Sequence, residues 1–296
     1  MRPILLLLIY LVAVFGGGAL LAPWLYDFTQ WAGGHWAIFQ KLAGNPFSRF
    51  VLRSILGLAV MLVWPLLRGC GMLKSREMGL AGNGQVARDL ATGFAIGFAS
   101  LAAAAGLAVL CGGRSADTSR PDMAHLILGA TATAIIVAVL EELIFRATLF
   151  GILRKAFPWH VALIASSAVY ASVHFLQKLP TPAHIDWLSG IRMLPEMFQP
   201  AADPPLVPTF FTLFLAGSAL ALAYQRTGAL YMSMGLHAGW IFWLTAYRSF
   251  TRDAGGGSRV LWGSDKLIDG WLPCLILGLV LAGVWRWCRP GKVSRN

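Results

Sequence analysis

Residues Ile135 to Arg146 read IIVAVLEELIFR. An unbroken apolar run leads into two adjacent carboxylates, and the apolar residues then continue as far as an arginine. Charged side chains inside such a run are costly in a bilayer unless they are paired or hydrated. The stretch is therefore typical of a membrane helix that carries a polar cluster in its interior.

The spacing of these charges separates two kinds of side chain. Glu142 and Arg146 are four residues apart, so they share one helix face and can pair. Glu141 lies about 100° around the helix from Glu142, which lets it point towards a functional site. The alternative is that all three side chains form one structural ion-pair cluster.

The composition of the whole chain agrees with a membrane setting. Of the 296 residues, 57% are hydrophobic and 12% are charged, whereas about 25% of the residues of soluble proteins are charged. The net charge of +11 does not indicate a nucleic-acid partner, because the Lys and Arg residues occupy short connectors between apolar runs. Trp residues near the ends of these runs are typical of an interfacial aromatic belt.

The apolar runs predict an all-α, polytopic membrane helix bundle with about eight transmembrane helices in a single membrane domain, 1–296. A spanning helix needs about 20 mostly apolar residues. The first run is also compatible with a signal peptide, but its length and the later spans favour an uncleaved helix. The eight predicted segments are 4–25, 50–68, 90–111, 124–154, 160–177, 207–224, 228–248 and 270–288.

The connectors give a weak signal for orientation and predict one helical segment outside the spans. Basic residues are almost evenly divided between the two sides, but a basic cluster in 68–88 and a basic C-terminal tail favour cytoplasmic termini. The proline-rich connector 179–208 is too broken for a span, and an interfacial segment is expected around 185–197.

Two histidines interrupt other predicted spans, His174 near the end of one and His237 in the middle of another. Either alone is compatible with a hydrogen-bonded packing role. If segments 124–154 and 160–177 form a hairpin that turns near Phe157–Pro158, Glu141 and His174 both lie roughly 24 Å from the turn. His237 also falls well inside the bilayer. The sequence therefore predicts one site built by three helices.

A carboxylate and an imidazole can together hold and deprotonate a water molecule. A second imidazole can donate a hydrogen bond to the oxyanion that forms when this water attacks a carbonyl group. Such a site hydrolyses peptides without a covalent intermediate. Serine, aspartate and zinc motifs of the types GxSG, GxGD and HExxH do not occur in the sequence.

We expect no metal and no other cofactor, because the histidines lie singly on different segments. The cysteines, Cys70, Cys111, Cys274 and Cys288, are scattered without a CxxC pair, so no disulfide or metal cluster is expected. A glutamate and two histidines can nevertheless form a catalytic zinc site, and this alternative stays open.

Three motifs resemble those of the CAAX prenyl protease and bacteriocin-processing family, EExxxR, FxxxH and HxxxN or HxxxD. They are Glu141-Glu142-xxx-Arg146, Tyr170-xxx-His174 and the later His237. The resemblance covers about 124–245 as a catalytic core, and the N-terminal helices of 1–112 lie outside it.

This resemblance implies an intramembrane glutamic endopeptidase that cleaves a peptide or protein substrate at the bilayer. In it, Glu141 and His174 would activate water and His237 would stabilise the oxyanion. We expect the protein in the plasma (inner) membrane. The prenylation state of the substrate and the oligomeric state are left open.

Two positions depart from the family pattern. Tyr170 replaces the family's Phe, and Ile241 stands where the family has Asn or Asp, which removes an oxyanion donor. Ser233, one turn before His237, is a candidate replacement. The missing Asn or Asp keeps a non-catalytic protein of the same fold, an immunity factor or scaffold, as an alternative. A proton-coupled transporter is a further alternative, since membrane Glu and His residues also build proton relays.

Overall fold

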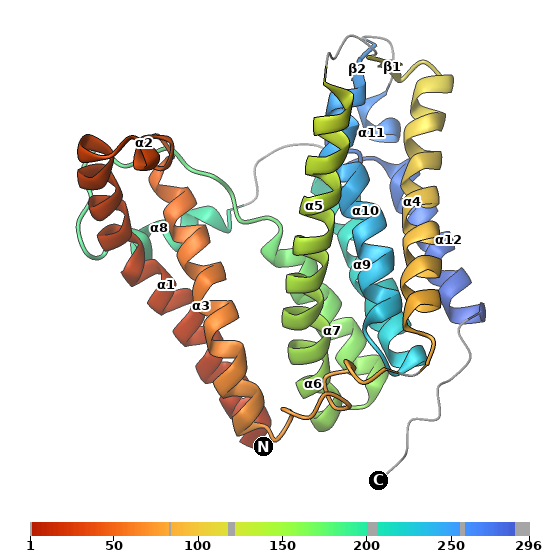
Figure 1. The fold of residues 1–296 in the computed structure, drawn as a ribbon, viewed down its shortest axis with the longest axis horizontal. Coiled ribbons are helices and arrows are strands. Elements are labelled where there is room, and N and C mark those ends of the chain that lie inside the picture. The colour runs from red at the N-terminus through yellow and green to blue at the C-terminus, as the bar shows by residue number, and fades with distance from the viewer. Residues whose placement is uncertain (1, 83, 118–121, 200–205, 255–257, 288–296) are drawn as a thin grey trace. The chain divides into compact units, whose positions relative to one another are not determined.

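The structure is a computed structural model that describes residues 2–82, 84–117, 122–199, 206–254 and 258–287. Almost all regular elements in these ranges are helices (Figure 1), and their one sheet is a pair of short strands. The predicted all-α membrane helix bundle is therefore confirmed as the fold class.

The chain forms two compact units. The first comprises Met1–Met72 and Val173–Ala201, and the second comprises Leu73–Ser172 and Ala202–Asn296. That they act as a single membrane domain stays a prediction.

The first unit is a helical hairpin with a short helix packed against it. In this unit α1 packs against the other three helices, and Gly18 and Gly190 allow close approaches to the backbone of Ile55 and Ala19. The short helix lies inside the connector for which an interfacial segment was predicted, and its place at a membrane surface stays a prediction. The elements are α1 (Arg2–His35), α2 (Ala37–Ala43), α3 (Phe47–Gly69) and α8 (Ser189–Met197).

The second unit holds most of the predicted catalytic residues. Its long helices lie side by side in Figure 1, with α10 against α4, α5 and α9, and α12 against α4 and α9. The strands pair in antiparallel fashion with Arg114 opposite Asp253. The elements are α4 (Val86–Leu110), β1 (Arg114–Ala116), α5 (Met123–Glu141), η1 (Glu142–Phe150), α6 (Gly151–Ala156), α7 (Trp159–Val173), α9 (Leu206–Thr227), α10 (Tyr231–Phe250), β2 (Thr251–Asp253), α11 (Arg259–Trp262) and α12 (Trp271–Trp287).

Five helices of the described chain are long and apolar enough to cross a membrane. The α7 and α12 helices are shorter apolar helices. Every predicted span overlaps a helix, whereas the number of spans, eight, stays a prediction. The five are Arg2–His35, Phe47–Gly69, Val86–Leu110, Met123–Ala156 and Leu206–Thr227.

The helix Met123–Ala156 changes its hydrogen-bond pattern at Glu142, where α5 gives way to the π-helix η1. A π-helix closes its bonds five residues apart, and such segments are rare and frequent at functional sites. Within η1, the Thr148 hydroxyl donates to the Leu143 carbonyl, 2.8 Å away and five residues earlier. The sequence predicted ordinary helix here, so the change between Glu141 and Glu142 is a new finding.

Glycines on α4 and α10 bring the backbones of these two helices into contact. Gly93 and Gly97 of α4 lie against the backbone of α10, and Gly235 and Gly239 of α10 lie against the backbone of α4. A Cβ atom at any of the four would overlap a backbone atom of the other helix. Small residues four apart are a common device for close packing of membrane helices. Here they fix the helix that carries His237.

We expect Gly97→Ala to lower the free energy of unfolding by about 1–3 kcal/mol, because backbone atoms cannot yield as side chains do. The measurement is the unfolding temperature of purified protein in detergent. Gly106→Ala on the same helix is the matched control, because nothing lies within 4 Å of a Cβ atom there. Equal stability of the two variants would contradict the close packing of α4 and α10.

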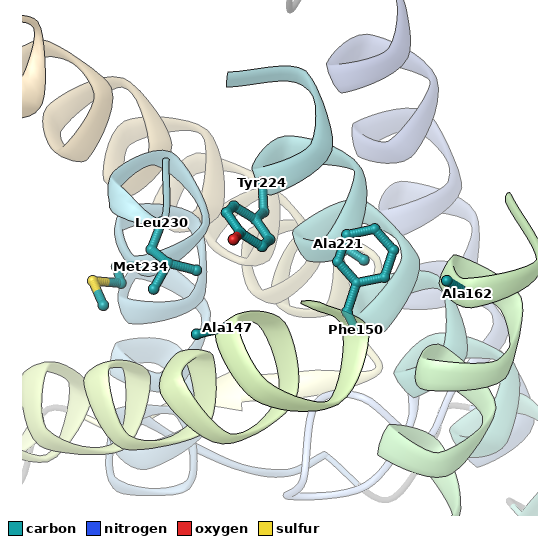
Figure 2. Packing of buried hydrophobic residues seen from close by; sticks show 7 residues of the cluster. All are labelled: Ala147, Phe150, Ala162, Ala221, Tyr224, Leu230 and Met234. Carbon is teal, nitrogen blue, oxygen red and sulfur yellow. The ribbon is translucent and has the colours of Figure 1, made fainter. Parts of the chain in front are cut away.

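A buried apolar cluster ties η1 to the neighbouring helices. Figure 2 shows Phe150 of η1 and Tyr224 of α9 within it, and their ring centroids are 6.0 Å apart. Because α7, α9 and α10 all contribute, the cluster holds the π-helical segment beside the helix of His237. Its buried members are Ala147, Phe150, Ala162, Ala221, Tyr224, Leu230 and Met234.

Candidate active site

A buried ion pair lies at the centre of the candidate site. Arg146 Nη1 is 3.1 Å from Glu142 Oε1, and both side chains are almost completely buried. The spacing of four residues predicted this pair. The guanidinium also lies 4.4 Å from the ring centroid of Tyr170, and its Nη2 donates to the Gly217 carbonyl at 3.4 Å. Breaking such a pair would leave an uncompensated buried charge, and a structural role for Arg146 stays a prediction.

His237 joins this ion pair from α10. Its Nδ1 is 2.9 Å from Glu142 Oε1, and the imidazole is buried. A carboxylate that pairs with a guanidinium accepts hydrogen bonds, so we assign the hydrogen to Nδ1 of His237. The other ring nitrogen, Nε2, is 3.6 Å from Glu141 Oε2. Glu142 thereby fixes both the tautomer and the orientation of the ring.

The two adjacent carboxylates lie in different environments. Glu141 ends α5 and its side chain is 23% exposed, whereas the side chain of Glu142, the first residue of η1, is 0% exposed. Glu142 contacts Arg146 and His237, while Glu141 approaches the opposite edge of the imidazole. This arrangement supports separate roles for the two carboxylates.

Tyr170 of α7 completes the group. Its hydroxyl is 3.4 Å from Nε2 of His237, and it also lies within hydrogen-bonding range of the Glu141 carboxylate. The ring makes an edge-on contact with Phe145, with centroids 5.0 Å apart. The sequence predicted Tyr170, with Glu142, Arg146 and Ser233, as a supporting residue of the site. The signal in the sequence for a polar contact of this residue was the hydroxyl group, which Tyr has and the family's Phe lacks.

Three predicted positions lie around or beyond this group. Ser233 is buried one turn before His237, donates to the Leu230 carbonyl at 2.8 Å and lies near Glu142. Ile241 follows His237 by one turn on α10 and brings no donor. His174 is exposed in the turn directly after α7 and belongs to the first unit. Its approach to Glu141 stays a prediction.

No three His, Cys, Asp or Glu side chains in the described ranges are arranged as a metal site. The described cysteines, Cys70, Cys111 and Cys274, form no disulfide among themselves, and Cys288 lies outside the described residues.

Comparison with known protein families matches residues 123–243 to the Rce1-like family, described as type II CAAX prenyl endopeptidase Rce1-like. Neither the curated proteins nor the solved structures gave a significant match. The matched segment begins with α5 and contains Glu141, Glu142, Arg146, Tyr170 and His237. The matched range overlaps the segment 124–245, whose role as a catalytic core stays a prediction.

The family implies an intramembrane endopeptidase of the CAAX protease type, and therefore a hydrolase with a peptide or protein substrate at the membrane. Together with the long apolar helices, it indicates a multi-pass integral membrane protein. The resemblance seen in the sequence is confirmed by this match: residues 123–243 match the model of the Rce1-like family, type II CAAX prenyl endopeptidases.

Proposed function

We propose that this protein hydrolyses a peptide bond at the membrane without metal, using Glu141 as the base and His237 to stabilise the oxyanion. The observation that carries the proposal is the position of Glu141. It is the more exposed of the two carboxylates and lies beside an imidazole whose far nitrogen is held by the buried Glu142–Arg146 pair.

In the proposed reaction, Glu141, assisted by His174, takes a proton from a water molecule, and the water oxygen attacks the carbonyl carbon of the substrate. The carbonyl oxygen becomes an oxyanion. The carbon–nitrogen bond then breaks, the proton held by Glu141 passes to the leaving amine, and the carbonyl forms again as part of a new carboxyl group. No covalent enzyme intermediate forms.

His237 stabilises the oxyanion through Nε2 in this proposal. Because Nδ1 holds its hydrogen towards Glu142, Nε2 donates only when the ring carries a second proton. A charged donor forms a stronger hydrogen bond with an oxyanion than a neutral one. The Glu142–Arg146 pair therefore supports catalysis by holding the ring, while Glu141 takes part in the proton transfers.

The experiment that tests this proposal is cleavage of tail peptides by purified full-length protein in detergent, read by mass spectrometry. Peptides that end in a CAAX sequence are supplied in prenylated and unmodified form, before and after exhaustive chelation. We expect cleavage of at least one form at a rate that chelation does not change. Activity that is lost on chelation and restored by zinc would contradict the metal-free mechanism.

A non-catalytic protein of the same fold is the second candidate, favoured by Ile241 in place of the family's Asn or Asp. The same assay separates the two, since a scaffold or immunity factor would cleave no peptide in either form.

We also propose that the protein lies in the plasma membrane with both termini in the cytoplasm. The basic C-terminal tail supports this orientation. A reporter enzyme fused after Asn296 would be active in the cytoplasm, and activity on the other side of the membrane would reverse the orientation.

A further inference from the structure

Ile241 leaves the site without the oxyanion donor that the family pattern has at this position. An aliphatic side chain has no donor, and Ser233, the candidate from the sequence, already donates its hydroxyl hydrogen to the Leu230 carbonyl at 2.8 Å. His237 presents towards Glu141 a nitrogen that lacks a hydrogen in the neutral ring. The site therefore needs a second donor beside Nε2.

We propose that the hydroxyl of Tyr170 is this donor and binds the oxyanion together with His237; the proposal rests on the proposed function and deepens it. The hydroxyl oxygen is 3.4 Å from Nε2 of His237. Two donors at this separation can both reach one oxygen atom at about 2.7–3.1 Å, the distance range of oxyanion donors. Glu141 lies next to the same two groups, 3.6 Å from Nε2 through its Oε2. The base and both donors thus converge on one position.

Besides the contacts of its hydroxyl with His237 and Glu141, Tyr170 is held by contacts to its ring. Arg146 lies over the ring face at 4.4 Å from the centroid, and Phe145 contacts the ring edge-on. Both contacts belong to the ring, so a phenylalanine can keep them. The residue itself is 4% exposed, and a hydrogen bond in a buried site is stronger than in water. The hydroxyl donates a hydrogen bond only, and no proton leaves Tyr170 in this step.

The test is Tyr170→Phe, which removes one oxygen atom and installs the residue of the family pattern. We expect kcat to fall by roughly 10²–10³-fold, the usual loss of one oxyanion donor, with KM little changed. The affinity for a peptidyl difluoromethyl ketone, whose hydrate mimics the tetrahedral intermediate, should fall by a similar factor. A kcat within about threefold of the wild type would overturn the proposal; Glu141→Gln in the same assay shows whether the proposed function itself stands.

Tyr224→Phe is the matched control. Tyr224 is also buried, it lies under a guanidinium, that of Arg154, and its hydroxyl donates to the Glu77 carbonyl at 3.2 Å, but it lies outside the site. We expect it to leave kcat and the affinity for the ketone unchanged. A loss of kcat in Tyr224→Phe as large as that in Tyr170→Phe would show a general effect of removing a buried hydroxyl and would overturn the proposal.

A second variant separates donation to the oxyanion from mere support of Glu141. Ile241→Asn returns the donor of the family pattern one turn after His237. In the Tyr170→Phe background we expect it to recover at least tenfold in kcat. A folded double variant that stays as slow as Tyr170→Phe would assign the hydroxyl to holding Glu141 and would overturn its role as an oxyanion donor.

Discussion

Replacing Glu141 by Gln is expected to reduce peptide cleavage by roughly 10²–10⁴-fold, the usual contribution of a general base. The amide keeps the shape of the side chain but cannot take a proton from water. The side chain is 23% exposed, and the buried pair of Glu142 and Arg146 stays intact, so the yield of folded protein should stay near normal. The measurements are the cleavage rate and the elution profile of the purified variant in detergent.

The matched control for this prediction is Glu196→Gln, the same change at an exposed carboxylate on α8. It should cleave at the rate of the wild type. Wild-type activity in Glu141→Gln would remove Glu141 from the reaction, and with it the proposed mechanism.

The second large effect is on stability. Arg146→Ala is expected to cost about 3–5 kcal/mol and to lower the yield of folded protein sharply, because it leaves Glu142 as a buried charge without its cation. His237 remains beside Glu142, but a single hydrogen bond does not neutralise the carboxylate. Yield and unfolding temperature in detergent measure the effect.

Two further variants identify the cause of that loss. Arg88→Ala removes the same charge from an arginine whose side chain is 70% exposed, and surface pairs contribute about 0–1 kcal/mol. The double change Glu142→Gln and Arg146→Gln removes both charges, so it should be more stable than Arg146→Ala alone. A double variant as unstable as the single one would mean that packing of the long arginine side chain, and not its charge, stabilises this region.

The sequence predicted the helices and the ion pair because these follow from local rules. Apolar length identifies a membrane helix, and four-residue spacing places Glu142 beside Arg146. The expected turn near Phe157–Pro158 also occurs, since α6 ends at Ala156 and α7 begins at Trp159. Such features depend on neighbouring residues and on helix geometry alone.

The contact of Glu142 with His237, and that of Tyr170 with the same imidazole, could not be predicted in this way. Each contact joins separate helices and depends on how each helix is rotated about its own axis. This rotation cannot be read from the sequence, because apolar residues lie on several faces of each helix. The π-helix has no signal in the sequence either, because its residues are also compatible with an α-helix. The approach of His174 to Glu141 stays a prediction, as does its role.

The glycines between α4 and α10 bear on how this protein can vary among its relatives. The family match begins at residue 123, yet the helix that carries His237 lies in backbone contact with α4, which ends at Leu110. A fragment cut at Met123 would lose that support. The segment that matches the family model is therefore shorter than the segment that the fold needs, because the fold also needs α4. Among relatives, we expect the residues of α4 that face lipid to vary freely in sequence. At the two pairs of glycines we expect substitutions in α4 and α10 to occur together.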